Sequence, residues 1–216
     1  MSKSGIKSVL FDYGGVIAEE GFVEGLTALA ENSKLDRDFF IDAAFDLVAS
    51  TGYLTGRADE AAFWEAMRKT TGIRGPDERL RREILSRFIL RPWVLNLADD
   101  LRSLDITVGI LSDQTDWLDQ LDARDGFFRR FDYVSNSFHL GLSKRGEAVF
   151  AETERRLGVP SKGICFVDDN EGNCERARKS GWHAIRYRTG GQVLRELKEL
   201  VPELDLSWYA GVIGED

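Results

Sequence analysis

Cysteine, histidine and proline are scarce in this sequence. Of its 216 residues, two are Cys, two are His and four are Pro. Cys165 lies in an apolar segment and Cys174 in a helical one, so we expect both to be buried, inert thiols in a reducing compartment. A metal site built on them would need more ligands. His139 and His183 have no metal-ligand spacing, and we assign them no catalytic role.

Long apolar runs and an excess of basic charge are also missing. No run approaches the roughly 20 apolar residues of a membrane-spanning helix, and the first residues lack the apolar centre of a signal peptide. The net charge of −8 argues against nucleic acid or an anionic membrane as a partner. We therefore expect a soluble, cytoplasmic monomer or homodimer, whose 43% hydrophobic content allows a full core and a modest insert.

The first apolar run, residues 8–11, ends in Asp12 and is followed by Gly14 and Gly15. A carboxylate at the carboxyl end of a buried strand is where an open α/β sheet presents groups to a ligand. The two glycines allow the main chain to come close to a ligand or a metal ion. The sequence therefore predicts a reactive group at Asp12, although an aspartate after a strand is often only a turn former.

Further apolar runs also end in polar residues. Residues 106–111 and 163–167 are short and rich in β-branched side chains, which indicates strands followed by ligand loops. Residues 135–144 form a strand-like stretch that leads into a loop lysine. The polar residues at these boundaries are Ser112, Asp113, Lys144, Asp168 and Asp169.

The order of these residues resembles the four motifs of the haloacid dehalogenase-like hydrolase superfamily. The motif residues are Asp12, Ser112, Lys144, Asp168, Asp169 and Asn173, and the resemblance covers nearly the whole chain. Segments 11–17 and 166–173 are similar to small phosphatases related to the amino-terminal domain of soluble epoxide hydrolase. The resemblance implies an enzyme that hydrolyses a small phosphorylated metabolite with the help of Mg²⁺.

Phosphate monoester hydrolysis needs a nucleophile, neutralisation of the phosphoryl charge and a proton for the leaving oxygen. We expect Asp12 to attack phosphorus and form an aspartyl phosphate. Ser112 is expected to donate a hydrogen bond to a phosphoryl oxygen, and Lys144 to pair with both the nucleophile and the phosphoryl group. Asp113 adds negative charge beside the substrate unless it caps the helix that begins near Asp116.

An oxygen-only site suits Mg²⁺. We expect Asp12, the Gly14 carbonyl and Asp169 to be its ligands, with Asp168 as an additional or supporting ligand. Asn173 is expected to hold a water on the ion or to orient Asp169. Each residue taken singly has a structural explanation, such as a turn or a helix cap. Like charges gathered at one sheet edge are costly without a cation, which favours the metal site.

One departure from the superfamily pattern concerns proton transfer. Many of its phosphatases have a second aspartate two residues after the nucleophile, as general acid and base, where this chain has Gly14. General acid-base catalysis contributes roughly two to four decades in rate. We therefore expect a slower enzyme, a good leaving group, or a proton from water or the cap. Arg145 also replaces the proline that often follows the motif lysine.

The periodicities predict an α/β fold, a doubly wound parallel sheet with an inserted α-helical cap. Residues 19–90 show helical spacing without a convincing strand and form the predicted cap. Residues 1–18 and 91–216 form the predicted core. Within the cap, Arg57 is a candidate for binding a second anionic group of the substrate, although a solvated loop position is the simpler interpretation.

Three functional classes remain open. The first is the Mg²⁺-dependent phosphatase. The second is a metal-independent 2-haloacid dehalogenase, in which a similar aspartate attacks carbon. The third is a non-catalytic phosphate-binding or regulatory protein that keeps the fold, a class favoured by Gly14. Metal dependence separates the two enzymes, and binding without turnover separates both from the third.

Overall fold

The computed structural model describes residues 5–214, in which five parallel strands form one sheet in the order β3-β2-β1-β4-β5. Consecutive strands are joined through helices, and the chain runs outward from β1 in both directions, as in a doubly wound sheet. The predicted fold class is confirmed. The strands are β1 (Ser8–Phe11), β2 (Thr107–Ser112), β3 (Tyr133–Asn136), β4 (Ile164–Asp168) and β5 (His183–Arg186).

The register brings the carboxyl ends of the three central strands together. Phe11 of β1 pairs with Ile110 of β2 on one side and with Val167 of β4 on the other. The residues that follow these positions along each strand therefore lie at one edge of the sheet, which is where the sequence places its acids.

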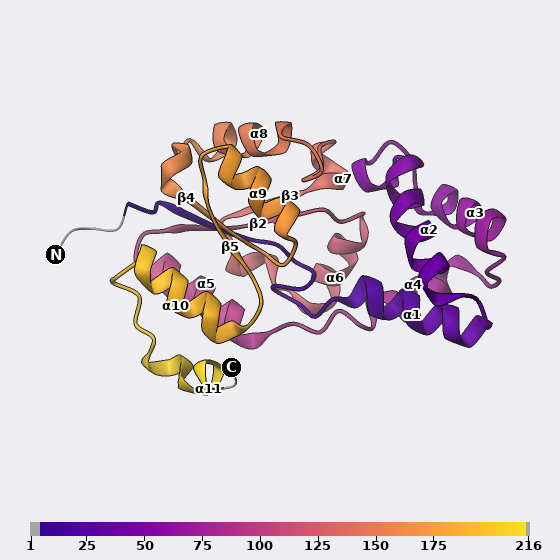
Figure 1. Ribbon diagram of the computed structural model, residues 1–216, viewed down its shortest axis with the longest axis horizontal. Helices are drawn as coiled ribbons and strands as arrows, with labels where there is room; N and C mark the ends of the chain where they lie inside the picture. Colours follow the sequence, from indigo (N-terminus) through magenta and orange to yellow (C-terminus); the bar gives the residue numbers. More distant parts are fainter. Residues whose placement is uncertain (1–4, 215–216) are drawn as a thin grey trace.

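Helices cover both faces of the sheet (Figure 1). Alternate side chains of β1 point to opposite faces, since Val9 and Phe11 belong to one buried cluster and Leu10 to another. The first cluster includes residues of α5 (Pro92–Ser103) and α10 (Gly190–Leu200), and the second includes residues of α8 (Ala148–Leu157) and α9 (Glu171–Lys179).

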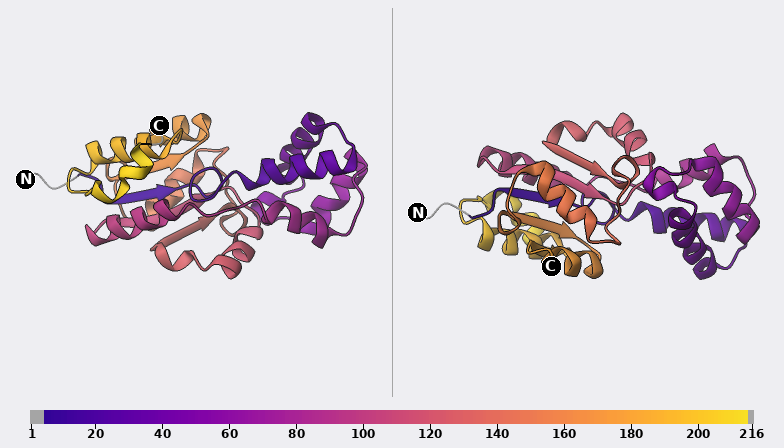
Figure 2. Two further views of the ribbon diagram at one scale, coloured as in Figure 1. Left: turned by 90° about the horizontal axis from the view of Figure 1, so that it is seen from below. Right: turned by 90° about the horizontal axis from the view of Figure 1, so that it is seen from above.

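A separate group of helices lies beyond the carboxyl edge of the sheet (Figure 2). Two chain segments join it to the core and pair with each other, since Glu19 N donates to the Ile89 carbonyl and Arg91 N to the Ile17 carbonyl. This double crossing forms the hinge of the group. Its helices are α1 (Gly21–Ser33), α2 (Arg37–Ser50), the short η1 (Tyr53–Thr55), α3 (Glu60–Thr71) and α4 (Asp77–Leu85).

The strands predicted at residues 8–11, 106–111 and 163–167 agree with β1, β2 and β4 to within one residue, whereas one further prediction fails in part. The strand-like stretch 135–144 is wrong as a strand beyond Asn136, because residues Ser137–Leu140 form the helical turn α7. The Ser137 hydroxyl donates to the Leu54 carbonyl of the helical group, a contact across 83 residues. The remaining elements are α6 (Trp117–Asp125), η2 (Phe128–Arg130), η3 (Ser161–Gly163), η4 (Ser207–Tyr209) and α11 (Ala210–Ile213).

No helix within residues 5–214 is both long enough and apolar enough to cross a bilayer. Cys165 and Cys174 are buried free thiols, as expected.

Candidate active site

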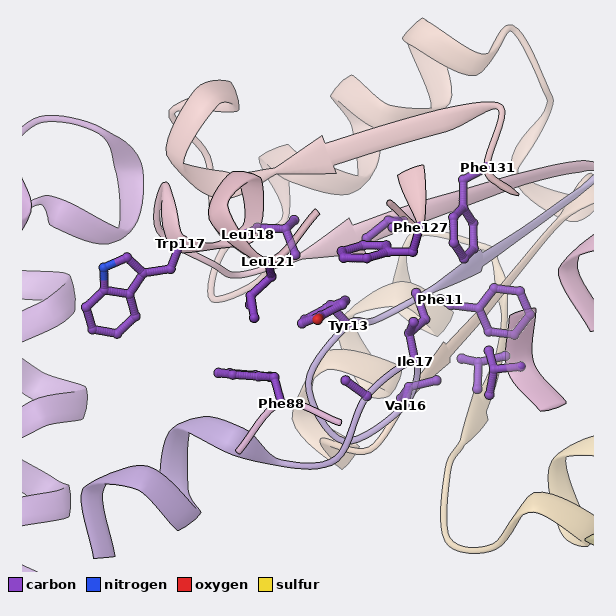
Figure 3. Packing of buried hydrophobic residues seen from close by; sticks show 14 of the residues in the cluster. Phe11, Tyr13, Val16, Ile17, Phe88, Trp117, Leu118, Leu121, Phe127 and Phe131 are labelled. Carbon is purple, nitrogen blue, oxygen red and sulfur yellow. The ribbon is translucent and has the colours of Figure 1, made fainter. Parts of the chain in front are cut away.

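Asp12 follows β1 directly, and its carboxylate is held by the turn that it begins. The Tyr13 amide donates to Asp12 Oδ1 at 2.7 Å. The Tyr13 ring is buried and stacks on Phe127, with ring centroids 4.9 Å apart, and it also contacts Phe88 (Figure 3). Apolar packing on one side of the turn therefore fixes the carboxylate on the other.

Lys144 lies between two aspartates. Its Nζ is 2.6 Å from Asp12 Oδ2 and 2.6 Å from Asp168 Oδ2, and the residue is only 1% exposed. The main chain around it is fixed as well, since Lys144 N donates to Asp113 Oδ1 and its carbonyl accepts from Arg176 Nε. The predicted pairing of Lys144 with Asp12 is thus present. Asp113 holds the lysine loop and does not cap α6.

Ser112, at the end of β2, donates to Asp12 Oδ1 at 2.6 Å. Its hydroxyl thus orients the Asp12 carboxylate in this structure, whereas the sequence suggested a direct bond to the phosphoryl group. With Tyr13 N on the same oxygen and Lys144 on the other, both oxygens of Asp12 accept hydrogen bonds. The carboxylate is held in one orientation from three directions.

Asp168 and Asp169 have different surroundings. Asp168 is fully buried, and Lys144 Nζ, Asn170 N and Asn173 Nδ2 donate to its oxygens. The expected contact of Asn173 with Asp169 is wrong, because the Asn173 amide contacts Asp168 at 3.0 and 3.1 Å. Asp168 therefore serves as an anchor for Lys144, while Asp169 faces the cavity described below.

Gly15 is required for the position of Asp169. Its φ is +75°, and a Cβ added there would lie 2.4 Å from Asp169 Oδ2. Any larger residue at this position would displace the carboxylate. Gly14 also lines the cavity, and its main chain pairs with Ala18 in an isolated bridge.

The site holds more negative than positive charge. Burial raises the pKa of Asp12 well above its usual value, an effect that Lys144 opposes and Asp168 reinforces. Burial, together with the charge of Asp168, raises the pKa of Asp169 as well. Burial would lower the pKa of Lys144, but the charges of Asp12, Asp168 and Asp113 outweigh it and hold this pKa above its usual value. Another cation would relieve the repulsion between the acids.

The arrangement of the acids fits such a cation. Asp12, Asp168 and Asp169 each offer a carboxylate oxygen, and these oxygens lie within 4.8 Å of one another. Asp168 is fully buried and does not line the cavity, whereas Asp12 and Asp169 do, so these two are the better ligand candidates. A donor set of carboxylate oxygens is of the kind that Mg²⁺ prefers.

The site opens into a cavity of about 490 Å³ between the sheet edge and the helical group. Asp12, Lys144 and Asp169 lie on its floor, and the side towards the helical group is largely apolar. Arg145 links the two sides, since its Nη2 donates to the Phe45 carbonyl at 3.2 Å. The apolar lining residues are Phe22, Val23, Phe45, Val48, Leu54 and Trp117.

The structure places Arg57 outside this cavity. It is exposed, and its Nε donates to Thr55 Oγ1 at 3.2 Å. The simpler interpretation, a solvated loop arginine, describes its position.

The sequence reasoning missed several polar residues that line the cavity, among them Glu20 and Gln114, which lie beside Gly14. Burial, followed by the charge of Asp169, raises the pKa of Glu20 to about 7. The available signal was the acidic pair 19–20 immediately before α1, which is easily interpreted as an ordinary helix start.

The sequence matches no protein-family model, and a search of curated proteins gives no significant match. Solved structures share its fold. A haloacid dehalogenase (HAD) family enzyme from Bacteroides thetaiotaomicron is 22% identical, with a TM-score of 0.71 over 86% of this chain and 95% of that one. It has also been solved as a complex with magnesium and inorganic phosphate, which superposes with a TM-score of 0.68.

Two further structures show the range of the fold. A predicted HAD-like family hydrolase from Porphyromonas gingivalis is 19% identical, with a TM-score of 0.72 over 91% of this chain and 98% of that one. An L-2-haloacid dehalogenase from Xanthobacter autotrophicus, with chloropropionic acid covalently bound, is 20% identical, with a TM-score of 0.62 over 90% and 83% of the two chains. The chain thus has the haloacid dehalogenase-like fold that its motifs predicted.

Proposed function

We propose that this protein is a Mg²⁺-dependent phosphatase that hydrolyses a small phosphorylated metabolite through an aspartyl phosphate on Asp12. The observation that carries the proposal is the convergence of Asp12, Lys144 and Asp169 on the floor of one cavity. The magnesium and phosphate complex of the Bacteroides enzyme, which has the same fold, supports it.

Each residue of the site has a role in this reaction. The carboxylate of Asp12 attacks phosphorus, and Ser112 and the Tyr13 amide orient it by their contacts with Oδ1. Lys144, held by Asp168, neutralises charge on the nucleophile and on the transferring phosphoryl group. Asp12 and Asp169 would hold Mg²⁺, with the Gly14 carbonyl as the further ligand suggested by the sequence. When bound, the ion neutralises charge on the phosphoryl oxygens.

The size and lining of the cavity support the proposal of a small substrate. Its volume of about 490 Å³ lies within the usual range of small-molecule sites, roughly 300–1,000 Å³. The polar floor suits the phosphate, and the apolar wall suits a leaving group with a hydrophobic part. The helical group, docked at the sheet edge, shields the reacting atoms from water.

The dehalogenase is the second candidate, because an L-2-haloacid dehalogenase has the same fold. Attack on carbon requires no divalent cation. Here three carboxylates lie within 4.8 Å with Lys144 as the cation that contacts two of them, and burial raises the pKa of Asp12. This excess of negative charge is what a divalent cation would compensate, which favours phosphatase chemistry.

The test is a panel of phosphate monoesters and 2-chloropropionate, each assayed with Mg²⁺ and with a chelator. We expect phosphate release that requires Mg²⁺ and falls by at least about three decades in Asp12→Asn. Asp38→Asn, an exposed acid on α2, is the matched control and should retain full activity. Chloride release without metal would establish the dehalogenase instead. Tight binding of phosphate and Mg²⁺ without turnover would identify the regulatory class.

A further inference from the structure

The position of the missing acid-base aspartate is filled from elsewhere in the chain. Gly14 does not have a positive φ, so its backbone conformation alone does not require glycine. A Cβ added to Gly14 would lie 3.1 Å from Glu20 Oε2, 3.5 Å from the Phe88 ring and 3.6 Å from Gln114 Nε2. The carboxyl group of Glu20 thus takes the space beside Gly14 that a side chain at position 14 would otherwise use.

Glu20 is held in this position by the hinge. It is the N-cap residue of α1, and its Oε1 accepts from the Val23 amide at 3.4 Å. The next residue, Gly21, packs directly on Phe88, where a Cβ would meet the ring at 2.5 Å. One oxygen of the carboxyl group is therefore tied to the helix, while the other, Oε2, accepts no hydrogen bond from any described residue.

The other acids that line the cavity have hydrogen-bond partners or proposed roles of their own. Asp12 is the nucleophile and Asp169 the candidate cation ligand. Asp113 accepts from the Lys144 amide, and Glu171 pairs with Arg178 at 2.7 Å. Glu20 is therefore the lining carboxyl group that lies at Gly14 and has an oxygen that accepts no hydrogen bond from a described residue.

We propose that Glu20 is the general acid and base of the reaction, an inference that rests on the proposed phosphatase function. In the first half, the bond from Asp12 to phosphorus forms and the bond to the leaving oxygen breaks. The leaving oxygen takes the bonding electron pair and the Glu20 proton, and departs as an alcohol. In the second half, the Glu20 carboxylate takes a proton from water, whose oxygen attacks phosphorus. The bond to Asp12 then breaks, which releases phosphate and restores the protonated Glu20.

The test compares two esters of similar size whose leaving groups differ in basicity, para-nitrobenzyl phosphate and para-nitrophenyl phosphate. The benzyl ester leaves as a basic alkoxide that needs a proton to depart, whereas the phenyl ester leaves as a nitrophenolate that does not. Glu20→Gln keeps an oxygen that caps α1 but cannot transfer a proton. The value of kcat/KM covers only steps up to departure of the leaving group, so slow hydrolysis of the aspartyl phosphate does not enter it.

We expect Glu20→Gln to lower kcat/KM about 100-fold or more for the benzyl ester and less than about fivefold for the phenyl ester. Hydrolysis of the aspartyl phosphate, the second half of the reaction, also needs the base. The variant should therefore accumulate this intermediate and release a burst of nitrophenol equal to the enzyme concentration. Glu19→Gln is the matched control, since Glu19 pairs with Arg91 at the hinge and does not line the cavity. It should leave both values unchanged.

Equal losses for the two esters, or no loss for either, would overturn the role of Glu20 and leave the phosphatase proposal intact. Equal losses accompanied by a lower melting temperature would assign Glu20 to capping α1. If the wild-type protein hydrolyses neither these esters nor any other phosphate ester with Mg²⁺, the proposed function is wrong, and the inference falls with it.

Discussion

Replacing Lys144 by Met should destabilise the metal-free protein strongly. The lysine is 1% exposed and makes ion pairs of 2.6 Å with both Asp12 and Asp168. Met has a similar length and fills the space, but it leaves two buried carboxylates without their cation. Removing one partner of a buried ion pair costs about 3–5 kcal/mol. At about 2–4 °C per kcal/mol for a chain of this size, the melting temperature should fall by about 6–20 °C.

Thermal and urea unfolding with a chelator present measures this cost without compensation from a divalent cation. Arg155→Met is the control, because it removes a cation from an ion pair in which 70% of the arginine side chain is exposed, and it should leave the melting temperature nearly unchanged. The double variant Lys144→Met, Asp168→Asn removes one of the two unpaired charges and should recover at least about 1 kcal/mol of the loss. A Lys144→Met variant as stable as the control, or a double variant no more stable than the single one, would refute the ion-pair argument.

Three further predictions concern the acids and the groups that position them. In Gly15→Ala the new Cβ displaces Asp169, so the Mg²⁺ concentration for half-maximal binding, measured by calorimetry, should rise at least about tenfold. Gly158→Ala is the control, because Gly158 also has a positive φ, +65°, but open space around it, and this variant should leave binding unchanged. Ser112→Ala removes a hydrogen bond to a charged oxygen, worth about 1.5–3 kcal/mol, and should lower kcat roughly 10–100-fold in steady-state assays. Finally, burial raises the pKa of Glu20 from its usual value of 4.5 to about 7, so the folded metal-free protein binds this proton more tightly than the unfolded chain. The resulting stabilisation is complete below the unfolded pKa and is lost as pH rises through about 7. Over this range the free energy of unfolding of the wild-type protein, measured by urea titration, should fall by about 3 kcal/mol relative to that of Glu20→Gln. Parallel pH profiles of the two proteins would contradict the prediction.

Much of the cavity floor could be predicted because a parallel sheet imposes a simple rule. All strands end at the same edge, so acids and hydroxyls that follow apolar runs must gather there. Asp12, Ser112 and Asp168 illustrate this, since their strands lie side by side in one register. The pairing of Lys144 with Asp12 was also expected, from the resemblance of the motifs.

The division of roles between Asp168 and Asp169 could be recognised only in the structure. Adjacent residues at the end of a strand point in different directions, and the sequence does not say which one meets Lys144. The structure directs Asp168 to Lys144 and Asn173, and Asp169 over Gly15 into the cavity. The helical turn at Ser137–Leu140 is similar, because its Ser137 is held by a contact with Leu54 that no local pattern contains.

The sequence by itself determined the class of fold, the sheet edge at which the acids gather and the candidate nucleophile, because hydrophobic periodicity and strand ends are local properties. Only the tertiary structure decided which carboxyl group occupies the space left by Gly14. Glu20 reaches that space because the chain folds back through the bridges of Ala18 with Gly14 and Leu90, which brings the start of α1 to Gly14. The direction of a side chain across a hinge depends on the packing of residues far apart in the chain, such as Phe88 against Gly21, and packing of that kind leaves no periodic signal in a sequence.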